Sequence, residues 1–197
     1  MMAILSFAGS DGWLVLGAYG VAASVVQAFG RVRCLVQGCC HGRPVAETPG
    51  IRYTHPRSRV SRLSDLSGRP LHPTQVYSIV WSAWTFALLM RLWVIGAPLS
   101  FIAGCFFILN GLGRFVEEHF RGEPQTPTVA GLRVYQWMAI VSVVAGAILT
   151  AVRTAAAPPV QLPTPLSWIA AAIVGAITYV AYGVDFPRLD RRFARLV

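Results

Sequence analysis

The sequence contains no lysine and few acidic residues. Its 197 residues include 17 arginines against eight Asp or Glu, which gives a net charge of +9. Charged residues amount to 13% of the chain, compared with about 25% in a soluble domain. Hydrophobic residues reach 55% and the mean hydropathy is +0.55, which excludes a disordered chain and argues against a soluble globule. The sequence therefore predicts a small polytopic membrane protein, and nucleic acid, the usual partner of a basic soluble protein, is not expected.

Five apolar segments approach the roughly 20 residues that a helix needs to cross a bilayer. They cover residues 13–29, 76–95, 99–116, 134–152 and 166–184. The predicted fold is an all-α, polytopic membrane helix bundle of about five transmembrane helices, forming a single integral membrane domain over residues 1–197. Residues 31–72, rich in glycine, proline and arginine, are expected to form a long loop on the membrane surface. Residues 1–11 carry no basic residue and are not expected to act as a signal peptide.

The arginines are unevenly distributed between the two ends of these spans. With five spans, fourteen of the seventeen lie on one side, in the surface loop, the turn after the third span and the C-terminal tail. The positive-inside rule predicts that this side is cytoplasmic. Some of these arginines could instead hold phosphate, and the count does not separate the two roles.

The third span ends in charged residues spaced for one face of a helix. Arg114, Glu117, Glu118 and Arg121 follow the spacing i, i+3, i+4 and i+7. This spacing allows ion pairs between Arg114 and Glu118 and between Glu117 and Arg121. Charges at the end of a span are costly unless they are paired or face a wet cavity. Because Arg114 lies deepest, we expect it to be functional, whereas Glu117 and His119 are interpreted as an interfacial cluster that only ends the helix.

The first span runs into a segment rich in glycine and arginine. The residues concerned are Gly30, Arg31, Arg33, Gly38, Gly42 and Arg43. Glycine permits close approach of the backbone, and the planar guanidinium fork suits phosphate oxygens. The pattern indicates either a pocket for an anionic lipid head group or a basic loop that lies on anionic lipid without forming a pocket.

The cysteines do not follow a metal-binding pattern. Cys34, Cys39, Cys40 and His41 are spaced Cys-x-x-x-x-Cys-Cys-His, which lacks the Cys-x-x-Cys pairs of structural zinc sites. Neighbouring cysteines also rarely bind one ion together, so no metal is predicted. Cys34 and Cys105 are interpreted as small packing residues. Cys39 and Cys40 could form a redox pair or supply a nucleophile, and the sequence singles out neither.

The second span begins at a proline flanked by polar residues. Pro73 suits the first turn of a helix, and His72, Gln75 and Tyr77 then lie near the expected depth of a lipid head group. His72 could act as a general base or donate a hydrogen bond to phosphate. An equally good interpretation is that it caps the helix at the interface.

In this order, these motifs resemble those of the prolipoprotein diacylglyceryl transferase family. The glycine–arginine signature of the family is met by Gly30-Arg31, Gly38 and Gly42-Arg43. The start of its next span is similar to His72-Pro73-Thr74-Gln75-Val76-Tyr77. Its Arg-x-x-x-Glu-x-x-Arg helix end is similar to Arg114, Glu118 and Arg121, and Tyr135-Gln136-Trp137 looks like the start of the span that follows.

The resemblance implies a multi-pass enzyme of the bacterial inner membrane. Such enzymes transfer the diacylglyceryl group of phosphatidylglycerol to a lipoprotein cysteine thiol and release glycerol phosphate. By analogy, Arg31 and Arg114 contact the phosphate and Glu118 orients Arg114, and we add His72 to the catalytic candidates. The candidate substrate-binding residues are Arg33, Gly38, Gly42, Arg43, Gln75, Tyr77, Asn110 and Arg121. The expected partners are a phospholipid, a lipoprotein or other acceptor, and a second copy or partner subunit, with no cofactor and no metal.

Several positions depart from the family pattern. Cys34 stands where the family has an asparagine, Cys39 where it has an acidic residue, and Asn110 where it has a tyrosine. The N-terminal spans of the family, with their His-Gly-Gly motif, have no counterpart in the sequence, and the family signature faces the periplasm. These departures favour a relative that acts on another acceptor or lipid. The alternatives are a non-catalytic lipid-binding membrane subunit and, last, a transporter or channel.

Overall fold

The computed structural model of the chain describes residues 10–46, 50–122, 127–161 and 163–182. These residues are mostly helical, and the chain divides into two compact units, Met1–Pro159 and Val160–Val197. The described part of the first unit holds four long helices, and that of the second unit holds one shorter apolar helix.

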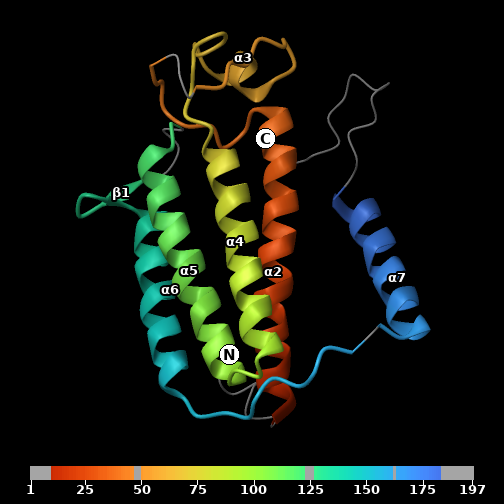
Figure 1. The fold of residues 1–197 in the computed structure, drawn as a ribbon. Coiled ribbons are helices and arrows are strands. Elements are labelled where there is room, and N and C mark those ends of the chain that lie inside the picture. Colours follow the sequence, from red (N-terminus) through yellow and green to blue (C-terminus); the bar gives the residue numbers. More distant parts are fainter. Residues whose placement is uncertain (1–9, 47–49, 123–126, 162, 183–197) are drawn as a thin grey trace. The chain divides into compact units, whose positions relative to one another are not determined.

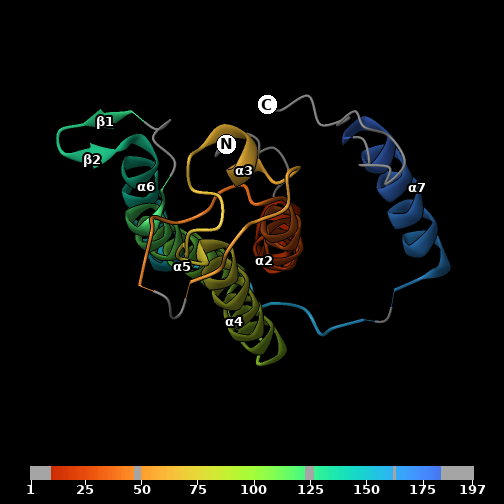
Figure 2. The same cartoon turned by 90° about the horizontal axis from the view of Figure 1, so that it is seen from above.

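Four helices of the first unit are long and apolar enough to cross a membrane. They are α2 (Ser10–Gln37), α4 (Thr74–Val94), α5 (Leu99–Phe120) and α6 (Val134–Ala151). The four run side by side, and α5 contacts each of the other three (Figure 1). Figure 2 shows the same arrangement from above, with α5 between α4 and α6. The predicted all-α, multi-pass membrane fold is confirmed.

α2 continues beyond the predicted end of the first span at residue 29. Neither proline nor a positive φ interrupts the helix before Gly38, where φ reaches +71°. Arg31, Arg33 and Cys34 therefore lie on a helix and not in a surface loop. This correction matters for the site, because the side chain of Arg31 is carried by the same rigid element as the first span.

α5 also continues beyond the predicted end of its span at residue 116. Glu117 was expected, with His119, to end the helix as an interfacial cluster, yet Glu117 and its neighbour Glu118 are both buried and both paired with arginines. Since the pairing offsets their charge, the helix runs on to Phe120.

The fifth expected span corresponds to α7 (Pro165–Tyr182) in the second unit. Its apolar part, Pro165–Thr178, is shorter than the four candidate spans of the first unit. The predicted end of this span at residue 184 lies outside the described residues. That the whole chain forms one integral membrane domain stays a prediction.

The segment between α2 and α4 covers the end of the first unit where α2 finishes (Figure 1). It contains α3 (Arg59–Leu63), whose N-cap Ser58 accepts a hydrogen bond from the backbone N–H of Ser61. Leu71 bridges to Pro44 and Ile51 and is fully buried. The described parts of the expected surface loop are thus an ordered cover that fixes the turn after α2.

Two glycines bring α5 and α6 into close contact. A Cβ added at Gly104 would lie 2.6 Å from the carbonyl oxygen of Gly146, and one added at Gly146 would lie 2.6 Å from that of Gly104. Small residues at a membrane helix crossing allow this backbone approach. The crossing holds α6 against α5.

A short hairpin positions the start of α6. It pairs β1 (Thr128–Val129) with β2 (Leu132–Arg133), and the backbone N–H of Arg133 donates to Oε1 of Gln136, 3.0 Å away. This cap fixes the backbone of Arg133 beside the end of α5. Its guanidinium then donates to the backbone carbonyl of Arg121 at 3.2 Å.

Candidate functional site

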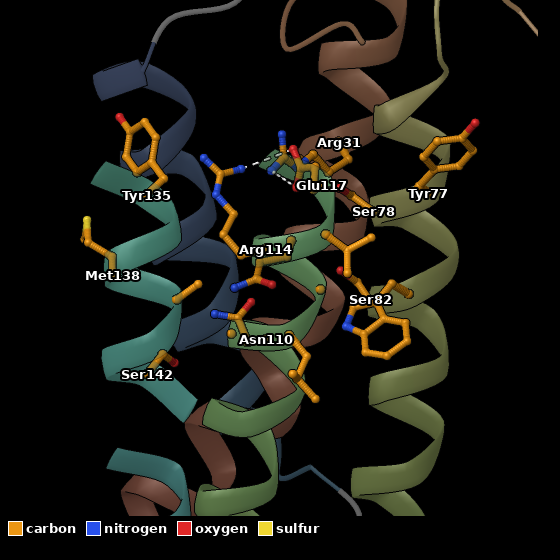
Figure 3. Close-up of a pocket in the computed structure, with 18 of the residues that line it drawn as sticks. Arg31, Tyr77, Ser78, Ser82, Asn110, Arg114, Glu117, Tyr135, Met138 and Ser142 are labelled. Carbon is orange, nitrogen blue, oxygen red and sulfur yellow. Dashed lines mark hydrogen bonds and ion pairs between the residues drawn. The ribbon is translucent and has the colours of Figure 1, made fainter. Parts of the chain in front are cut away.

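A cavity of about 750 Å³ lies among α2, α4, α5 and α6, towards the end of the unit where α2 and α5 finish. Its size falls within the range of about 300–1,000 Å³ that is typical of small-ligand pockets. Polar side chains from all four helices line it (Figure 3). They include Arg31, Tyr77, Ser78, Asn110, Arg114, Glu117 and Tyr135.

Glu117 joins the two arginines of the cavity. Its Oε2 accepts from Nη2 of Arg31 at 2.8 Å, and its Oε1 accepts from Nη1 of Arg114 at 3.1 Å. Ser78 of α4 donates to the same Oε2 at 2.8 Å, and the carboxylate is only 6% exposed. Figure 3 shows both guanidinium groups converging on Glu117. The interpretation of Glu117 as a residue that merely ends the helix is therefore wrong.

Glu118 forms a second ion cluster directly behind the first. It is fully buried, and its carboxylate lies 3.7 Å from Arg114, 3.3 Å from Arg121 and 3.3 Å from Arg133. The expected pair of Arg114 with Glu118 is present, whereas Arg121 pairs with Glu118 and not, as expected, with Glu117. The reason is geometric. The side chain of Glu117 points towards α2, so it pairs with Arg31 and not with Arg121, the partner that the helical spacing predicted.

The part of the ion clusters at the cavity carries an excess of positive charge. Where the clusters meet the cavity, Arg31 and Arg114 share one carboxylate, that of Glu117, so these three side chains carry a net charge of +1. Excess charge next to a membrane interior is costly unless a counter-charge is at hand. Arg114 also lies over the ring of Tyr135, 5.0 Å from its centroid, which fixes its direction. The arrangement therefore suits an anionic ligand in the cavity.

The profile of the prolipoprotein diacylglyceryl transferase family matches residues 1–152 of the chain. The chain belongs to this family. The match contains every residue of both ion clusters, and the resemblance inferred from the motifs is confirmed. The second unit, from Val160, lies beyond the matched residues.

Two curated relatives carry the corresponding activity in their names. The chain is 27% identical over 123 residues to the phosphatidylglycerol–prolipoprotein diacylglyceryl transferase of Clostridium tetani, a match that covers 62% of the chain and 47% of the relative. It is 32% identical over 133 residues to the phosphatidylglycerol–prolipoprotein diacylglyceryl transferase 2 of Clostridium perfringens, covering 64% of the chain and 46% of that relative. The chain thus spans about half the length of the curated relatives it matches.

Some of the site residues expected from the sequence meet in the cavity of this family member, and others do not. Among the described residues, Arg31, Tyr77, Asn110 and Arg114 line it. Outside its lining are Arg33, Gly38, Gly42, Arg43, His72, Gln75, Glu118 and Arg121. Glu118 and Arg121 lie behind the cavity lining, where both belong to the second ion cluster and Glu118 pairs with Arg114.

Of the remaining expected residues, Arg33 is exposed on α2, and the others lie at the cover over the end of the bundle. Gln75 is buried and donates from Nε2 to the carbonyl oxygen of Cys39 at 2.7 Å. Arg43 is exposed and donates to the carbonyl of His119 at 2.7 Å. Gly42 packs so closely on His72 that an added Cβ would collide with it. These residues hold the turn after α2 in place, and the structure gives them no contact with the cavity.

His72 contacts the cavity lining through one neighbour. Its Nδ1 lies 3.2 Å from the hydroxyl oxygen of Tyr77, which does line the cavity. His72 also packs against Phe120, with ring centroids 5.1 Å apart. Any part that His72 has in proton transfer must therefore pass through Tyr77.

Three cysteine side chains meet at the end of α2. The Sγ atoms of Cys34, Cys39 and Cys40 all lie within 4.8 Å of one another, and Cys34 also lines the cavity. Hydrogen bonds from Cys34 and Cys39, followed by the positive charge of Arg121, lower the pKa of the Cys40 thiol below its ordinary value. The same thiol network raises the pKa of Cys39, whose proton is retained. Cys34 is therefore more than the packing residue expected from the sequence.

Sequence reasoning missed Ser78 and Arg133 and undervalued Glu117. Ser78 and Arg31 meet Glu117 from other helices, and Arg31 is 86 positions away in the chain. Arg133 reaches Glu118 only because the hairpin places the start of α6 beside the end of α5. The helical repeat predicts only which residues of one helix share a face. Contacts between different helices, such as these, leave no local pattern in the sequence. The spacing within α5 did identify Glu118.

Proposed function

We propose that the chain is a membrane-embedded transferase that acts on a glycerophospholipid with a phosphatidylglycerol-like head group and transfers its diacylglyceryl group to an acceptor. The observation that carries the proposal is the convergence of two guanidinium groups, those of Arg31 and Arg114, on one carboxylate at the cavity. Family membership and the names of the relatives support the reaction type. A lipoprotein cysteine thiol is the acceptor to test first.

The chemistry is a displacement at the glyceryl carbon that carries the phosphate. The thiol loses its proton, sulfur forms a bond to that carbon, and the carbon–oxygen bond to phosphate breaks. Glycerol phosphate leaves with a second negative charge on its phosphate. In this proposal Arg31 and Arg114 stabilise that charge, which is greater in the transition state than in the bound lipid. Because the arginines are already held by Glu117 and Tyr135, little reorganisation is needed.

We propose that His72 helps to remove the proton of the acceptor thiol. The hydroxyl of Tyr77, a residue of the cavity lining, lies 3.2 Å from Nδ1 of His72 and can exchange a proton with it. His72 is then a positioning residue that acts through Tyr77. We expect Tyr77→Phe to abolish any effect of His72→Asn on the pH profile of turnover, since both substitutions interrupt one path.

The proposal is tested with purified protein, phosphatidylglycerol vesicles and a lipobox peptide, followed by mass spectrometry of the peptide. The expected product is the peptide carrying a diacylglyceryl group. Arg31→Ala and Arg114→Ala should each lower turnover by about 100-fold or more, which is the usual cost of removing one donor to a developing charge. Arg91→Ala, at the other end of α4, is the matched control and should keep full turnover. Full turnover in Arg114→Ala would contradict the phosphate assignment.

A second candidate is a lipid-binding membrane subunit without catalysis. It is favoured by one observation: among the described residues that line the cavity, the only carboxylate is Glu117, and two arginines already occupy it. This reading predicts saturable binding of phosphatidylglycerol, weakened in Arg31→Ala, with neither the peptide nor the lipid altered. We place either activity in the bacterial inner membrane, which fractionation of the native host tests. Assembly with a second copy or a partner subunit stays a prediction.

A further inference from the structure

We propose that Cys34, Cys39 and Cys40 form a binding site for one soft, thiophilic metal ion of the Zn²⁺ or Cu⁺ class. The inference rests on the geometry of the three thiols and not on the proposed function. The spacing of these cysteines in the sequence argued against a metal. The fold changes that argument, because it brings all three sulfur atoms within 4.8 Å of one another.

The distances suit three-fold coordination. A metal–sulfur bond of about 2.3 Å places three sulfur ligands about 4 Å apart in a trigonal site. Binding an ion therefore needs each pair of Sγ atoms to close by less than about 1 Å, a shift within reach of side-chain rotation. Thiolate sulfur selects soft ions such as Cu⁺ and Zn²⁺ over hard ones.

The backbone explains how two neighbouring cysteines can face one ion. In extended chain, successive side chains point to opposite sides. Cys40 instead has a φ of +55°, a left-handed conformation that breaks this alternation, and Gly38 just before the pair has a φ of +71°. Non-glycine residues hold such a conformation only where their surroundings enforce it.

Those surroundings are rigid contacts from the start of α4. The hydroxyl of Thr74 donates to the carbonyl oxygen of Cys40 at 2.6 Å, and Nε2 of Gln75 donates to that of Cys39 at 2.7 Å. Thr74 and Gln75 are themselves buried. The backbone N–H of Cys39 donates to the carbonyl of Cys34 at 3.2 Å, which closes the turn onto α2. The backbone that carries the three thiols is thus fixed, and only side-chain rotation has to bring the sulfur atoms to the bonding distance.

The charge around the thiols also fits an anionic metal–thiolate group. Three thiolates with Zn²⁺ carry a net charge of −1, and with Cu⁺ a net charge of −2. Nη2 of Arg121 donates to Sγ of Cys40 at 3.2 Å, in the manner of the outer hydrogen bonds that tune metal–sulfur sites.

The site would keep one coordination position for a small external ligand. Among the described residues, the group of potential ligands contains the three cysteines and neither histidine nor carboxylate. The neighbouring His41 directs its Nδ1 to the carbonyl of Gly42, 3.0 Å away. Three protein ligands with an open position are the pattern of reactive or exchanging metal sites, whereas structural zinc sites are closed by four.

The test uses the reduced full-length chain in detergent, without oxygen. Co²⁺ is titrated as a probe for Zn²⁺, and Cu⁺ is offered from a coloured chelator. We expect one ion per chain, with a thiolate-to-cobalt charge-transfer band that Zn²⁺ removes, or transfer of Cu⁺ from the chelator. Cys34→Ser, Cys39→Ser and Cys40→Ser should each weaken binding by more than about 100-fold, because loss of an outer hydrogen bond alone costs about 10- to 100-fold. Cys105→Ser, on α5, is the matched control and should bind as the unaltered chain does.

A second measurement does not depend on the folding of any variant. Alkylation of the unaltered chain, read by mass spectrometry, should modify three fewer thiols when Zn²⁺ or Cu⁺ is present. The proposal is overturned if the reduced chain shows neither charge transfer nor Cu⁺ uptake, or if the triple serine variant binds like the unaltered chain. It is equally overturned if two of the three thiols form a disulfide and the chain, once reduced, binds neither ion.

Discussion

Glu117 is the residue through which the two arginines of the cavity act together. It accepts hydrogen bonds from Arg31, Arg114 and Ser78, and so it links α2, α4 and α5 at one atom group. Its negative charge lowers the positive potential of the cavity, while its geometry directs both guanidinium groups. The charge of Glu117 weakens the binding of an anionic ligand, whereas its positioning of the two arginines favours it. A substitution that removes only the charge can separate these two effects.

Glu117→Gln keeps the shape of the side chain and removes its charge. The net charge of the cluster rises by one, so we expect the KM for phosphatidylglycerol to fall. The guanidinium groups lose the carboxylate that positions them, and a small misplacement at a reacting centre lowers the rate. We therefore expect kcat to fall by about 10- to 100-fold. Steady-state assays at varied lipid fraction measure both constants. Asp65→Asn, an exposed acid in the surface segment, is the control for charge alone, and an unchanged kcat in Glu117→Gln would contradict the positioning role.

Tyr53 gives the cover over the site a pH dependence. Burial raises the pKa of Tyr53 to about 12, while the hydrogen bond from Gln75 acts in the opposite direction. The unfolded chain releases this proton near pH 10, whereas the folded chain retains it up to about pH 12. The folded state therefore binds more protons in this window, and its stability falls as the pH rises through it.

Tyr53→Phe should remove that contribution to the loss of stability between about pH 10 and pH 12. It should also abolish the latest step of tyrosinate absorbance in a pH titration of the folded chain. Tyr19→Phe, on the exposed face of α2, serves as the comparison. If both variants lose stability across this window to the same extent as the unaltered chain, Tyr53 is not the group that titrates.

At the scale of elements, apolar length predicted the four long helices, but their ends and contacts depend on residues from elsewhere in the chain. Arg31 looked like the end of a span because a lone charge is costly in a membrane. The helix continues through it because Glu117 offsets the charge, and that partner lies on another helix. The cysteine spacing did not predict that the three thiols lie together, for the same reason, since the turn that gathers the thiols is set by Thr74 and Gln75 of α4.

The crossing of α5 and α6 depends on the two glycines that face each other there. A Cβ at Gly146 would lie 2.6 Å from the carbonyl oxygen of Gly104 and 2.8 Å from the backbone nitrogen of Ile108. We expect Gly146→Ala to lower the free energy of unfolding by about 1–3 kcal/mol, the usual cost of overpacking. Gly30→Ala on α2 is the control, because an added Cβ there meets no atom within 4 Å and alanine favours the helix. Denaturation in detergent compares the two, and equal stabilities would contradict the close crossing.

At the scale of the whole molecule, the arginines set the expected orientation. Arg31, Arg121 and Arg133 belong to the ion clusters and count less as topological signals. The segment between α2 and α4 still carries six other arginines, whereas Arg91 and Arg153 lie at the other end of the helices. We therefore expect the end with the cavity to face the cytoplasm.

An impermeant thiol reagent tests this orientation in a variant without native cysteines. Leu63→Cys, on exposed α3, should react only in inside-out membrane vesicles, and Ile95→Cys, exposed beyond α4, only in right-side-out vesicles. The opposite pattern would place the cavity at the periplasmic face, where an exported lipoprotein thiol is within reach. The expected pattern directs the search for an acceptor to the cytoplasmic side.

The confinement of the ion clusters to one end of the helices has a consequence for the bilayer itself. A lipid whose phosphate meets Arg31 and Arg114 must come from the leaflet at that end, since no second such cluster is present at the other end of the described helices. The proposed reaction removes a head group yet leaves both acyl chains in that leaflet. The areas of the two leaflets would then stay nearly equal, but the leaflet that supplies the lipid would lose negative surface charge. Continued turnover would therefore require a new supply of anionic lipid to that leaflet, whereas the curvature of the membrane would need no correction.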